Sequence, residues 1–566
     1  GFPEAAGRAE GDEQPSVYKG GKRVLGMPTV TQWLRPEEIY SCPTLMFLNG
    51  WEAAEGIVGM WETADNNDNK WLISALNIVA ANRGQMDRLF FGELDDTWID
   101  KGFFVCKFYK DDPNSDEDWH VVIVDDRFPC DSNGQPAFAK NKEEGVYWAM
   151  VVEKAYAKFA GSTPSRAGTY QAMAGGTVTQ GLEDLTGGLG YKFDLNKKEK
   201  EWVPPKGETP DRLWIEMMEK LSTEHVIGCS NNTKGQERPQ TTKKGILLNR
   251  AYAMVTGGEF EDHRLMRLRI PLDASEDVVE WNGKWSDKSA AWSNRLRQML
   301  NFSGDQDDGT FWMEYNDFCR HFNKVYMCRM LDDLWTRFTV KSRWMDTTAG
   351  GCTNFISWRN NNQWLLTISR PATKLIIKLT QPDARKSTGN GRHYTNAIGF
   401  YILRGNAPNE AGDHKRRKLI LQDGSPEDEP PGDFVFEKEP RFSRQVLAEF
   451  TFEEASDTPF VLVPYIFEPG REALFKMTIL SDDRDDDGIP DFEFKEVKPE
   501  DDWRRTTMID SWSKGGKGNP LGGEMSAGGD LSHASWAANC QFQLTLQQRT
   551  RCFVFLELIE VKTDMR

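Results

Sequence analysis

The stretch DNKWLISALNIVA, residues 68–80, places Lys70 where a helix should begin. From Trp71 onward the apolar residues follow helical spacing, and the Asp-Asn pair before Lys70 suits a helix start because its side chains can accept free N–H groups. A lysine there opposes the positive end of the helix dipole by about 0.3 kcal/mol or more. The same position favours a cysteine thiolate, so Lys70 stands where a catalytic cysteine would be activated.

A second stretch with chemical content is the acidic run SDDRDDDGIPDFEF, residues 481–494. Its carboxylates match the first half of an EF-hand calcium loop and continue at the ninth position: Asp483, Asp485, Asp487 and Asp491. The twelfth position is Phe494 instead of the bidentate glutamate. The run therefore admits two interpretations, a solvated acidic linker or an open calcium loop.

The basic cluster DHKRRKL, residues 413–419, lies between strand-like segments. Two interpretations are open for it as well. The cluster either contacts a membrane or an acidic partner such as a tubulin tail, or it is a solvated loop.

Composition excludes several classes of protein. With 566 residues, the chain should hold roughly three or four domains. Its net charge of −17 argues against nucleic-acid binding, and no apolar run reaches the roughly 20 residues of a transmembrane helix. The opening residues lack the apolar centre of a signal peptide. Nine cysteines without a CxxC pair or zinc spacing indicate reduced thiols in the cytoplasm.

The elements that must position Lys70 come from a globular region that begins near Trp33. We expect helices near 70–82 and 144–160, with a strand over 121–126 between them. A Pro/Gly-rich hinge at 203–210 then precedes a helix and several strand-like runs. From about residue 349 the chain alternates apolar and polar residues in short runs, which predicts an antiparallel β-sandwich.

An internal repeat follows this sandwich. The segment AGGCTNFISWRNNNQWLLT at 349–367 returns as AGGDLSHASWAANCQFQLT at 527–545, offset by 178 residues. Only about 40 residues remain for the second copy, and two or three strands cannot enclose a core. We therefore expect a fragment, or an incompletely ordered part, of a longer protein.

Several longer motifs resemble calpains, the intracellular papain-like cysteine proteases. The resemblance runs in the family's order from about Trp33 to residue 485. It rests on YWAMVVEKAYAKFAGS (147–162), YQAMAGGTVTQGLEDLTGG (170–188), EWNGKWSDKSAAW (280–292), DGTFWMEYNDFCRHF (308–322) and FVLVPYIFEPG (460–470).

The resemblance implies an α+β chain. It consists of a two-lobed calpain-type (papain-like) protease core, an antiparallel C2-like β-sandwich and the start of a second sandwich. The expected boundaries are a flexible segment 1–30, lobe one 31–209, lobe two 210–345, the C2-like sandwich 346–485, an acidic linker 486–515, and the incomplete second sandwich 516–566.

The resemblance also locates the catalytic positions. Calpains carry the cysteine in a G-D-C-W-L context, the histidine in G-H-A-Y and the asparagine in R-L-R-N-P-W. The matching residues here are Lys70, Arg250 and Ile270. The oxyanion-hole glutamine, six residues before the cysteine, corresponds to Ala64. Arginine cannot act as a general base, and isoleucine and alanine side chains offer no hydrogen bond, so we predict a pseudopeptidase.

Calpain cores also bind calcium through carboxylates in each lobe. The resemblance assigns Glu280, Asp287 and Asp308 to the second-lobe site, but Thr310 replaces its last acidic ligand. In lobe one Gln171 replaces a glutamate. Losing a carboxylate weakens a hard-cation site, so we predict vestigial sites and no required cofactor, with calcium as the alternative ligand.

Three functions follow from these observations. The first is a catalytically inactive scaffold or interaction module with protein partners, in a larger assembly at the cytoskeleton or flagellum, as degenerate calpain-like proteins of flagellated protists imply. The second is a calcium-responsive regulator that binds partners or a membrane surface through its C2-like domains. The third is an active hydrolase that uses other residues, and it needs chemistry that these residues do not supply.

Overall fold

The computed structural model describes the larger part of the chain. The described residues are 27–45, 57–58, 69–90, 101–141, 143–161, 170–198, 201–203, 210–221, 225–233, 241–270, 280–304, 309–331, 335–383, 394–405, 417–419, 421, 432–482, 489–498, 508, 512, 527, 529–545, 554 and 556. The chain divides into two compact units, Gly1–Lys498 and Pro499–Arg566. Most of the segment expected to be flexible, 1–30, lies outside the described residues.

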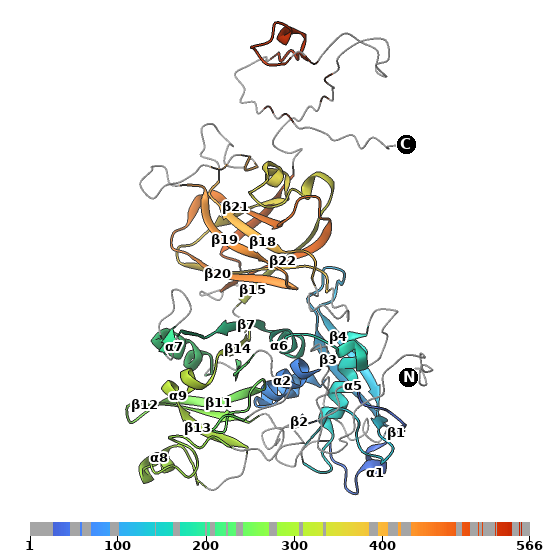
Figure 1. The fold of residues 1–566 in the computed structure, drawn as a ribbon, viewed down its shortest axis with the longest axis vertical. Coiled ribbons are helices and arrows are strands. Elements are labelled where there is room, and N and C mark those ends of the chain that lie inside the picture. Colours follow the sequence, from blue (N-terminus) through green and yellow to red (C-terminus); the bar gives the residue numbers. More distant parts are fainter. Residues whose placement is uncertain are drawn as a thin grey trace. The chain divides into compact units, whose positions relative to one another are not determined.

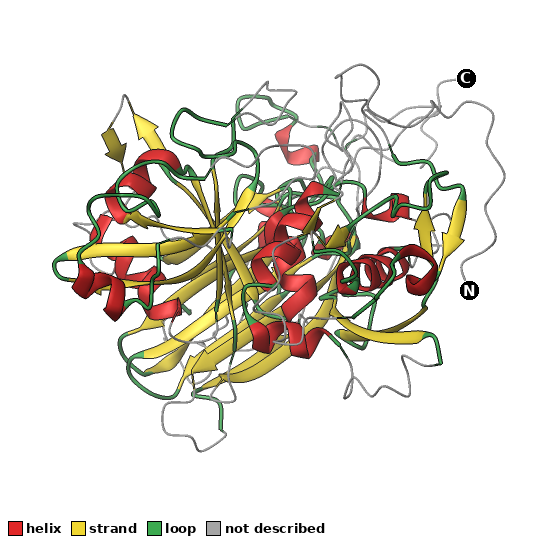
Figure 2. Ribbon diagram, turned by 90° about the horizontal axis from the view of Figure 1, so that it is seen from below, coloured by secondary structure: helices red, strands yellow, loops and turns green. Residues whose placement is uncertain are grey.

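Lobe one is built on helices that pack beside a β-hairpin (Figures 1 and 2). Its helical elements are α1 (Pro36–Ile39), α2 (Lys70–Val79), α3 (Arg83–Leu89), α5 (Trp148–Ala160), the 3₁₀ helix η2 (Tyr170–Met173) and α6 (Val178–Thr186). Its strands are β1 (Gln32–Leu34), β2 (Ile57–Val58), β3 (Phe103–Tyr109), β4 (Trp119–Asp125), β5 (Phe128–Cys130) and β6 (Lys140–Asn141). Helix α2 is buried along its whole length after Lys70, so it forms the centre of this lobe.

Lobe two is a six-stranded antiparallel sheet with strand order β13-β12-β11-β10-β14-β7. Its strands are β7 (Leu189–Asp194), β10 (Val226–Ser230), β11 (Ala251–Phe260), β12 (His263–Arg269), β13 (Thr310–Glu314) and β14 (Lys324–Arg329). The accompanying elements are β8 (Asn196–Lys198), β9 (Glu201–Val203), α7 (Pro210–Leu221), α8 (Asn294–Met299) and α9 (Tyr315–His321). Thus β7, which precedes the expected boundary at 209, completes the sheet of lobe two by pairing with β14.

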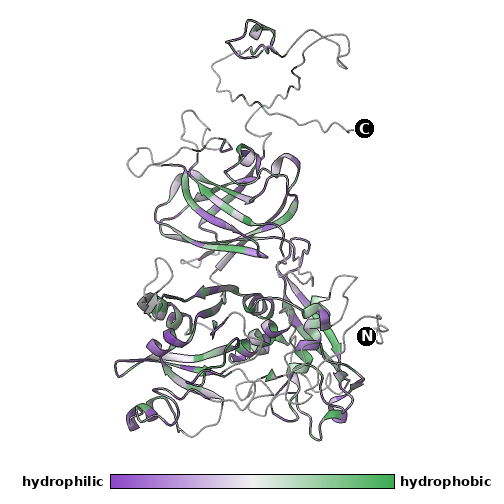
Figure 3. Cartoon of the chain, viewed as in Figure 1, coloured by the Kyte–Doolittle hydropathy of each residue, from purple (hydrophilic) through white to green (hydrophobic). Residues whose placement is uncertain are grey.

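The third region is an antiparallel sandwich of two sheets, with orders β15-β22-β17-β20 and β19-β18-β21-β16-β23. Its strands are β15 (Trp335–Trp344), β16 (Gln363–Ile368), β17 (Thr373–Thr380), β18 (Ile398–Leu403), β19 (Phe434–Arg441), β20 (Gln445–Phe452), β21 (Ser456–Ile466), β22 (Ala473–Asp482) and β23 (Phe492–Val497). The connections include η3 (Asp346–Thr348) and η4 (Ile356–Asn360). Figure 3 shows apolar and polar residues alternating along these strands. The expected fold class, a two-lobed core followed by a C2-like sandwich, is confirmed.

Two strands place the sandwich boundaries elsewhere than expected. Strand β15 lies before residue 346, yet it pairs with β22 along its whole length. Strand β23 lies within the expected acidic linker 486–515, yet it pairs with β16 as an edge strand. Both differences have the same cause. Each strand pairs with a segment more than 120 residues away, and the local composition gives no sign of such a partner.

The sheet that contains β17 and β22 is buried on both faces. Alternate residues of β17 such as Ile377 belong to the sandwich core. The residues between them face the other way but are buried as well, for example Lys378 at 3 % exposure. On that outer side Ile376 and Leu480 pack with Leu189 of lobe two's edge strand in one apolar cluster. The sandwich therefore docks on the core through this sheet, within the first unit.

The repeat is visible in the hydrogen bonds of both copies. In the sandwich, Asn361 donates from Nδ2 to the carbonyl of Gly351 (2.8 Å) after the η4 turn. In the second unit, Asn539 donates in the same way to Gly529 (2.6 Å) after the 3₁₀ turn η6 (Trp536–Ala538). Gly351 and Gly529 both have positive φ, 80° and 81°. The second copy thus reproduces the turn that leads into β16.

We expect Asn361→Ala to lower the free energy of unfolding of the first unit by about 2–4 kcal/mol, because it leaves two buried main-chain groups without their partners. These groups are the N–H of Gly350, which donates to Asn361 Oδ1 (2.8 Å), and the carbonyl of Gly351. Denaturant titration followed by tryptophan fluorescence measures the effect. Asn539→Ala is the matched control and should change the same transition by less than about 0.5 kcal/mol. Equal effects of the two substitutions would contradict this account of the turn.

Candidate functional site

The first predicted catalytic position is the first residue of α2. Lys70 begins the helix and is partly exposed, while the following residues Trp71–Val79 are buried. The main-chain N–H groups of Leu72 and Ile73 donate to the carbonyl of Asn69 (3.0 and 3.1 Å), which fixes the first turn. The structure thus places Lys70 at the helix start that the motif predicts.

The residue before Lys70 does not act as the expected cap. Asn69 is fully buried, and its side chain donates from Nδ2 to Oε1 of Glu153 on α5 (2.9 Å) instead of accepting from the first turn of α2. The other carboxyl oxygen of Glu153 accepts from the N–H of Ala139 (2.8 Å). Burial raises the pKa of Glu153 from 4.5 to about 8, although both hydrogen bonds favour the charged form. This pair was not predicted, because nothing local links residues 69 and 153.

The second predicted position lies directly before β11. Arg250 is only 2 % exposed, and its Nη1 donates to the carbonyl of Asn249 (3.2 Å). Asn249 has a positive φ of 59°, so the chain turns sharply into the strand. The next residue in the strand, Ala251, belongs to the same apolar cluster as Trp71. Strand β11 and helix α2 therefore share one apolar core and contact each other.

The third predicted position follows β12, which pairs with β11. Ile270 is buried, and its side chain joins the apolar core of lobe two. Its main-chain N–H donates to the carbonyl of Gly309 (2.8 Å). The fold thus places Arg250 and Ile270 at the paired ends of β11 and β12, and β11 contacts α2, the helix that begins with Lys70.

Other residues of the predicted cleft lie outside the described residues. These are Ala64 at the oxyanion position and three acids that precede α2 in the sequence, Glu62, Asp65 and Asp68. If Lys70 and Arg250 lie close together, their repulsion requires an acid nearby, and we expect one of these three to pair with them. The expected ion pairing of the cleft therefore stays a prediction.

The buried cysteines of the described chain are poor nucleophiles. Burial raises the pKa of the Cys328 thiol to about 12 and that of Cys229 well above its ordinary value. Cys328 lies on β14 and contacts the hydroxyl of Thr186 (3.3 Å). A thiol held in this way does not supply the thiolate that covalent catalysis needs.

The described histidines near the strands of lobe two have structural contacts. His263 opens β12, stacks beside Trp285 and lies 3.7 Å from a carboxylate oxygen of Glu314. His321 ends α9 and stacks edge-on with Trp281.

The residue predicted to replace the last acidic calcium ligand of lobe two lies beside a cation of the chain itself. Thr310 accepts a hydrogen bond from Nε of Arg267 (2.8 Å). Glu280 and Asp287 are partly buried nearby in the sequence of lobe two, and Asp308 lies outside the described residues. In lobe one, Gln171 lies exposed on η2. Within the described residues, no group of three or more His, Cys, Asp or Glu side chains is arranged to hold a metal ion.

One carboxylate of the acidic run is already paired. Asp491 lies 3.1 Å from Nε of Arg370 and is largely buried, immediately before β23. The other predicted ligands, Asp483, Asp485 and Asp487, lie outside the described residues. For Asp491 the structure therefore shows an ion pair that a calcium ion would have to displace.

At its C-terminal end, the basic cluster at 413–419 forms neither a surface for a membrane or partner nor a solvated loop. Arg417 donates to the carbonyls of Arg359 (3.0 Å) and Asn361 (2.5 Å), and Lys418 forms a buried ion pair with Asp433 (2.8 Å). Neither cation is available to contact a membrane or a solvated partner, because both are buried and bind loops of the sandwich through these contacts.

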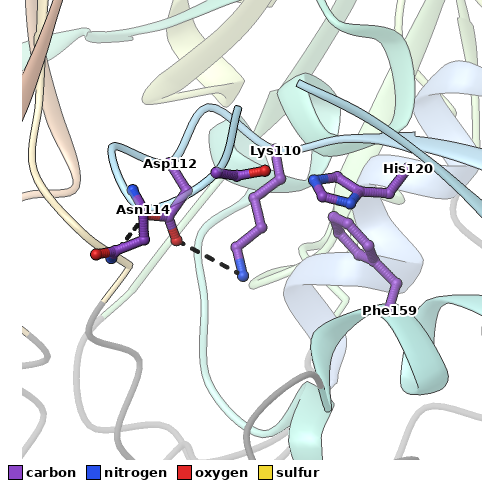
Figure 4. A pocket seen from close by; sticks show the side chains of 6 residues that line it. Lys110, Asp112, Asn114, His120 and Phe159 are labelled. Atoms are coloured by element: carbon purple, nitrogen blue, oxygen red, sulfur yellow. Dashed lines mark hydrogen bonds and ion pairs between the residues drawn. The ribbon is translucent and has the colours of Figure 1, made fainter. Parts of the chain in front are cut away.

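A shallow hollow of about 210 Å³ lies elsewhere, on the β3–β4 hairpin of lobe one (Figure 4). Its lining includes Lys110, Asp112, His120 and Phe159. Lys110 and Asp112 face each other at 3.8 Å, and Asp112 also accepts from the N–H of Asn114 (2.9 Å). These contacts shape the hairpin loop and do not extend to the cleft.

The geometry defines a two-lobed core of the papain type, followed by a C2-like sandwich. Comparison with known families agrees with this class. The calpain family cysteine protease domain matches residues 13–329, and domain III of the calpain large subunit matches residues 340–480. The chain belongs to the calpain family.

Individual relatives are distant in sequence. The calpain-type cysteine protease DEK1 of Zea mays is 28 % identical over 477 residues, which cover 81 % of this chain and 20 % of the maize protein. The calpain-2 catalytic subunit of Gallus gallus is 27 % identical over 511 residues, covering 83 % of this chain and 65 % of the chicken protein. The chain thus spans about a fifth of the plant relative and somewhat less than two thirds of the chicken one. Among the described residues, every helix is too short or too polar to cross a lipid bilayer.

We expect Glu153→Gln to make the protein more resistant to alkaline pH. Because the folded-state pKa of Glu153 is raised from 4.5 to about 8, its contribution to stability is complete below pH 4.5 and is lost as pH rises towards 8. A glutamine keeps the hydrogen bonds, since Asn69 can turn its amide to accept from it, but stays neutral. The difference in free energy of unfolding between variant and wild type should grow by roughly 3–5 kcal/mol between pH 5 and pH 8.5. A difference that does not change with pH would refute the buried, protonated carboxyl.

Proposed function

We propose that this protein is a catalytically inactive calpain that serves as a scaffold or interaction module. The support for the proposal is the motif alignment, which assigns the three triad positions to Lys70, Arg250 and Ile270. These residues lie at the start of α2, directly before β11 and directly after β12.

The chemistry of these three residues opposes acyl transfer. A lysine ammonium at a helix start is no substitute for a thiolate, and Arg250 keeps its proton at any accessible pH, so it cannot act as a general base. Ile270 is buried in the core of lobe two, and its side chain has no polar atom that could orient an imidazole. Each step of the family's mechanism therefore lacks its reactive group.

Lys70 could replace the cysteine only if a neighbouring group removed its proton. Arg250 cannot do so, and the histidine nearest to Arg250 along the chain, His263, packs at a tilt against Trp285 in lobe two. We therefore assign Lys70 a structural role in the cleft.

The same reasoning favours the scaffold over the calcium-responsive regulator. Arg267 and Arg370 lie against Thr310 and Asp491, so each of these two predicted calcium positions has a cation of the chain beside it. A guanidinium supplies a fixed positive charge where a calcium-dependent protein would leave the charge to the metal.

Partners and location stay predictions. The retained core, with α2 buried and two packed sheets in the sandwich, provides a rigid surface for protein partners. A cytoskeletal or flagellar assembly is what the likeness to degenerate calpain-like proteins implies, and proximity labelling of the tagged protein in its own cell tests it.

We expect the purified chain to cleave no calpain substrate and to form no adduct with cysteine-protease inhibitors, with or without calcium. Lys70→Ala should change neither result. The double variant Lys70→Cys/Arg250→His should also stay inactive, because Ile270 still fails to orient the new histidine. Turnover in the wild type that disappears in Lys70→Ala would contradict the proposal.

Calcium should leave the stability of the full chain unchanged. A ligand that binds only the folded state raises the free energy of unfolding by about 2.7 kcal/mol at a hundred times its dissociation constant. We expect equal melting temperatures in EDTA and in millimolar calcium, measured by scanning calorimetry. A calcium-dependent rise in the wild type would favour the regulator instead.

A further inference from the structure

The junction between lobe one and the sandwich contains two separate clusters of buried charge. In the first, Asp111 at the tip of β3 lies under Lys378 of β17 and Lys476 of β22 (2.8 Å for Lys476), with all three side chains at most 4 % exposed. In the second, Arg444 in the turn before β20 lies against α6. Both clusters put acids on lobe one and cations on the sandwich.

Arg444 is held by two acids in a forked arrangement. Its Nη1 lies 2.8 Å from Asp184 Oδ1 and its Nη2 lies 2.7 Å from Glu183 Oε2, with all three side chains at most 5 % exposed. Burial opposes the charged form, but the carboxylates of Asp184 and Glu183 outweigh it and raise the pKa of Arg444. The guanidinium therefore stays charged in this site and lies against both acids. Its single charge balances one carboxylate, and burial raises the pKa of Glu183.

The two acids are also fixed from the side of the core. Asp184 accepts from the hydroxyl of Tyr156 on α5 (2.6 Å), and Glu183 accepts from the N–H of Gly190 at the start of β7 (3.0 Å). Without Arg444 these contacts would hold two adjacent carboxyl groups in the interior, and only the charge of Lys378 in the first cluster would still favour ionisation of Glu183 among the cations named here. Such an arrangement is strongly unfavourable, so α6 would have to shift or open to hydrate them.

Helix α6 transmits this constraint to the cleft because it packs tightly on α2 (Figure 1). A side chain at Gly181 would meet Cβ of Ala75 at 2.6 Å, and one at Gly176 would meet the ring of Trp71 at 2.4 Å. Trp71 also donates from its indole to the carbonyl of Met173 (3.0 Å), just before α6. The two helices therefore have no room to move independently.

We propose that Arg444 is a latch through which docking of the sandwich fixes α6 and, through α6, the cleft helix α2 that begins with Lys70. The sandwich thus sets the geometry of lobe one's side of the cleft by a direct ion pair and without a metal. This inference is independent of whether the cleft is catalytic.

The Asp111 cluster makes the latch testable, because it keeps the sandwich docked when Arg444 is removed. Its acid lies on the β3–β4 hairpin, and the apolar cluster of Leu189, Ile376 and Leu480 holds the sandwich against lobe two as well. A change at α2 in an Arg444 variant therefore reports on the latch and not on loss of the whole interface.

The experiment is hydrogen–deuterium exchange with mass spectrometry on the full chain. In Arg444→Met, amide protection should fall by about tenfold or more in peptides covering α6 and α2, while the β3–β4 hairpin keeps its protection. The matched control is Arg329→Met. This substitution breaks another ion pair between the core and the sandwich, that of Arg329 with Glu449 (3.0 Å). Arg329 lies on β14, so this ion pair does not involve α6. The control should leave α2 within about twofold of the wild type.

A second variant separates charge from packing. Arg444→Met combined with Glu183→Gln and Asp184→Asn removes the uncompensated acids, and Tyr156 can still donate to the new amide. Protection of α2 should return to within about threefold of the wild type. The latch is overturned if Arg444→Met leaves α2 protected, if Arg329→Met exposes α2 equally, or if the triple variant stays as open as the single one.

Discussion

The buried carboxylate of Asp111 and the two lysines above it set the constraint on which the architecture of the first unit depends. A sheet with one solvated face could have carried its lysines in water, but the sheet of β17 and β22 is covered on both sides. Lys378 and Lys476 therefore need an acid from the core. Although burial opposes ionisation, these lysines lower the pKa of Asp111 below its ordinary value, so the acid and its two lysines are all charged. The sandwich can dock only where lobe one supplies that charge.

Most of the residues that stabilise the fold are different from the residues at the predicted catalytic positions. The residues at the triad positions lie at the ends of α2, β11 and β12, while the apolar clusters lie along those elements. A lysine at a helix start costs about 0.3–1 kcal/mol, which is small beside the burial of the rest of α2. At the third position, Ile270 adds an apolar side chain to the core of lobe two. The loss of catalytic groups that we propose therefore need not weaken the protein.

Features with a local signal could be predicted from the sequence, and features that depend on distant residues could not. Alternation and turn residues predicted the sandwich, and motif spacing placed Lys70 at a helix start, as the structure shows. The memberships of β15 and β23 escaped prediction because their partners lie far along the chain. The same holds for the pair of Asn69 with Glu153 and for Arg444, whose acid partners are 260 and 261 residues away. Arg417 looked like a surface cation for the same reason, since its carbonyl acceptors lie outside its own segment.

The two copies of the repeat show which features of the sandwich depend on local contacts and which depend on distant strands. Both copies form the 3₁₀ turn and the Asn–Gly hydrogen bond, which join residues about ten apart. Burial does not follow from the turn, since Trp358 is 5 % exposed in the sandwich and its counterpart Trp536 is 48 % exposed in the second unit. The difference is that β16 pairs with β21 and β23, which come from far along the chain. A short sequence can therefore specify its own backbone path, whereas its side chains become a core only when strands from elsewhere cover them.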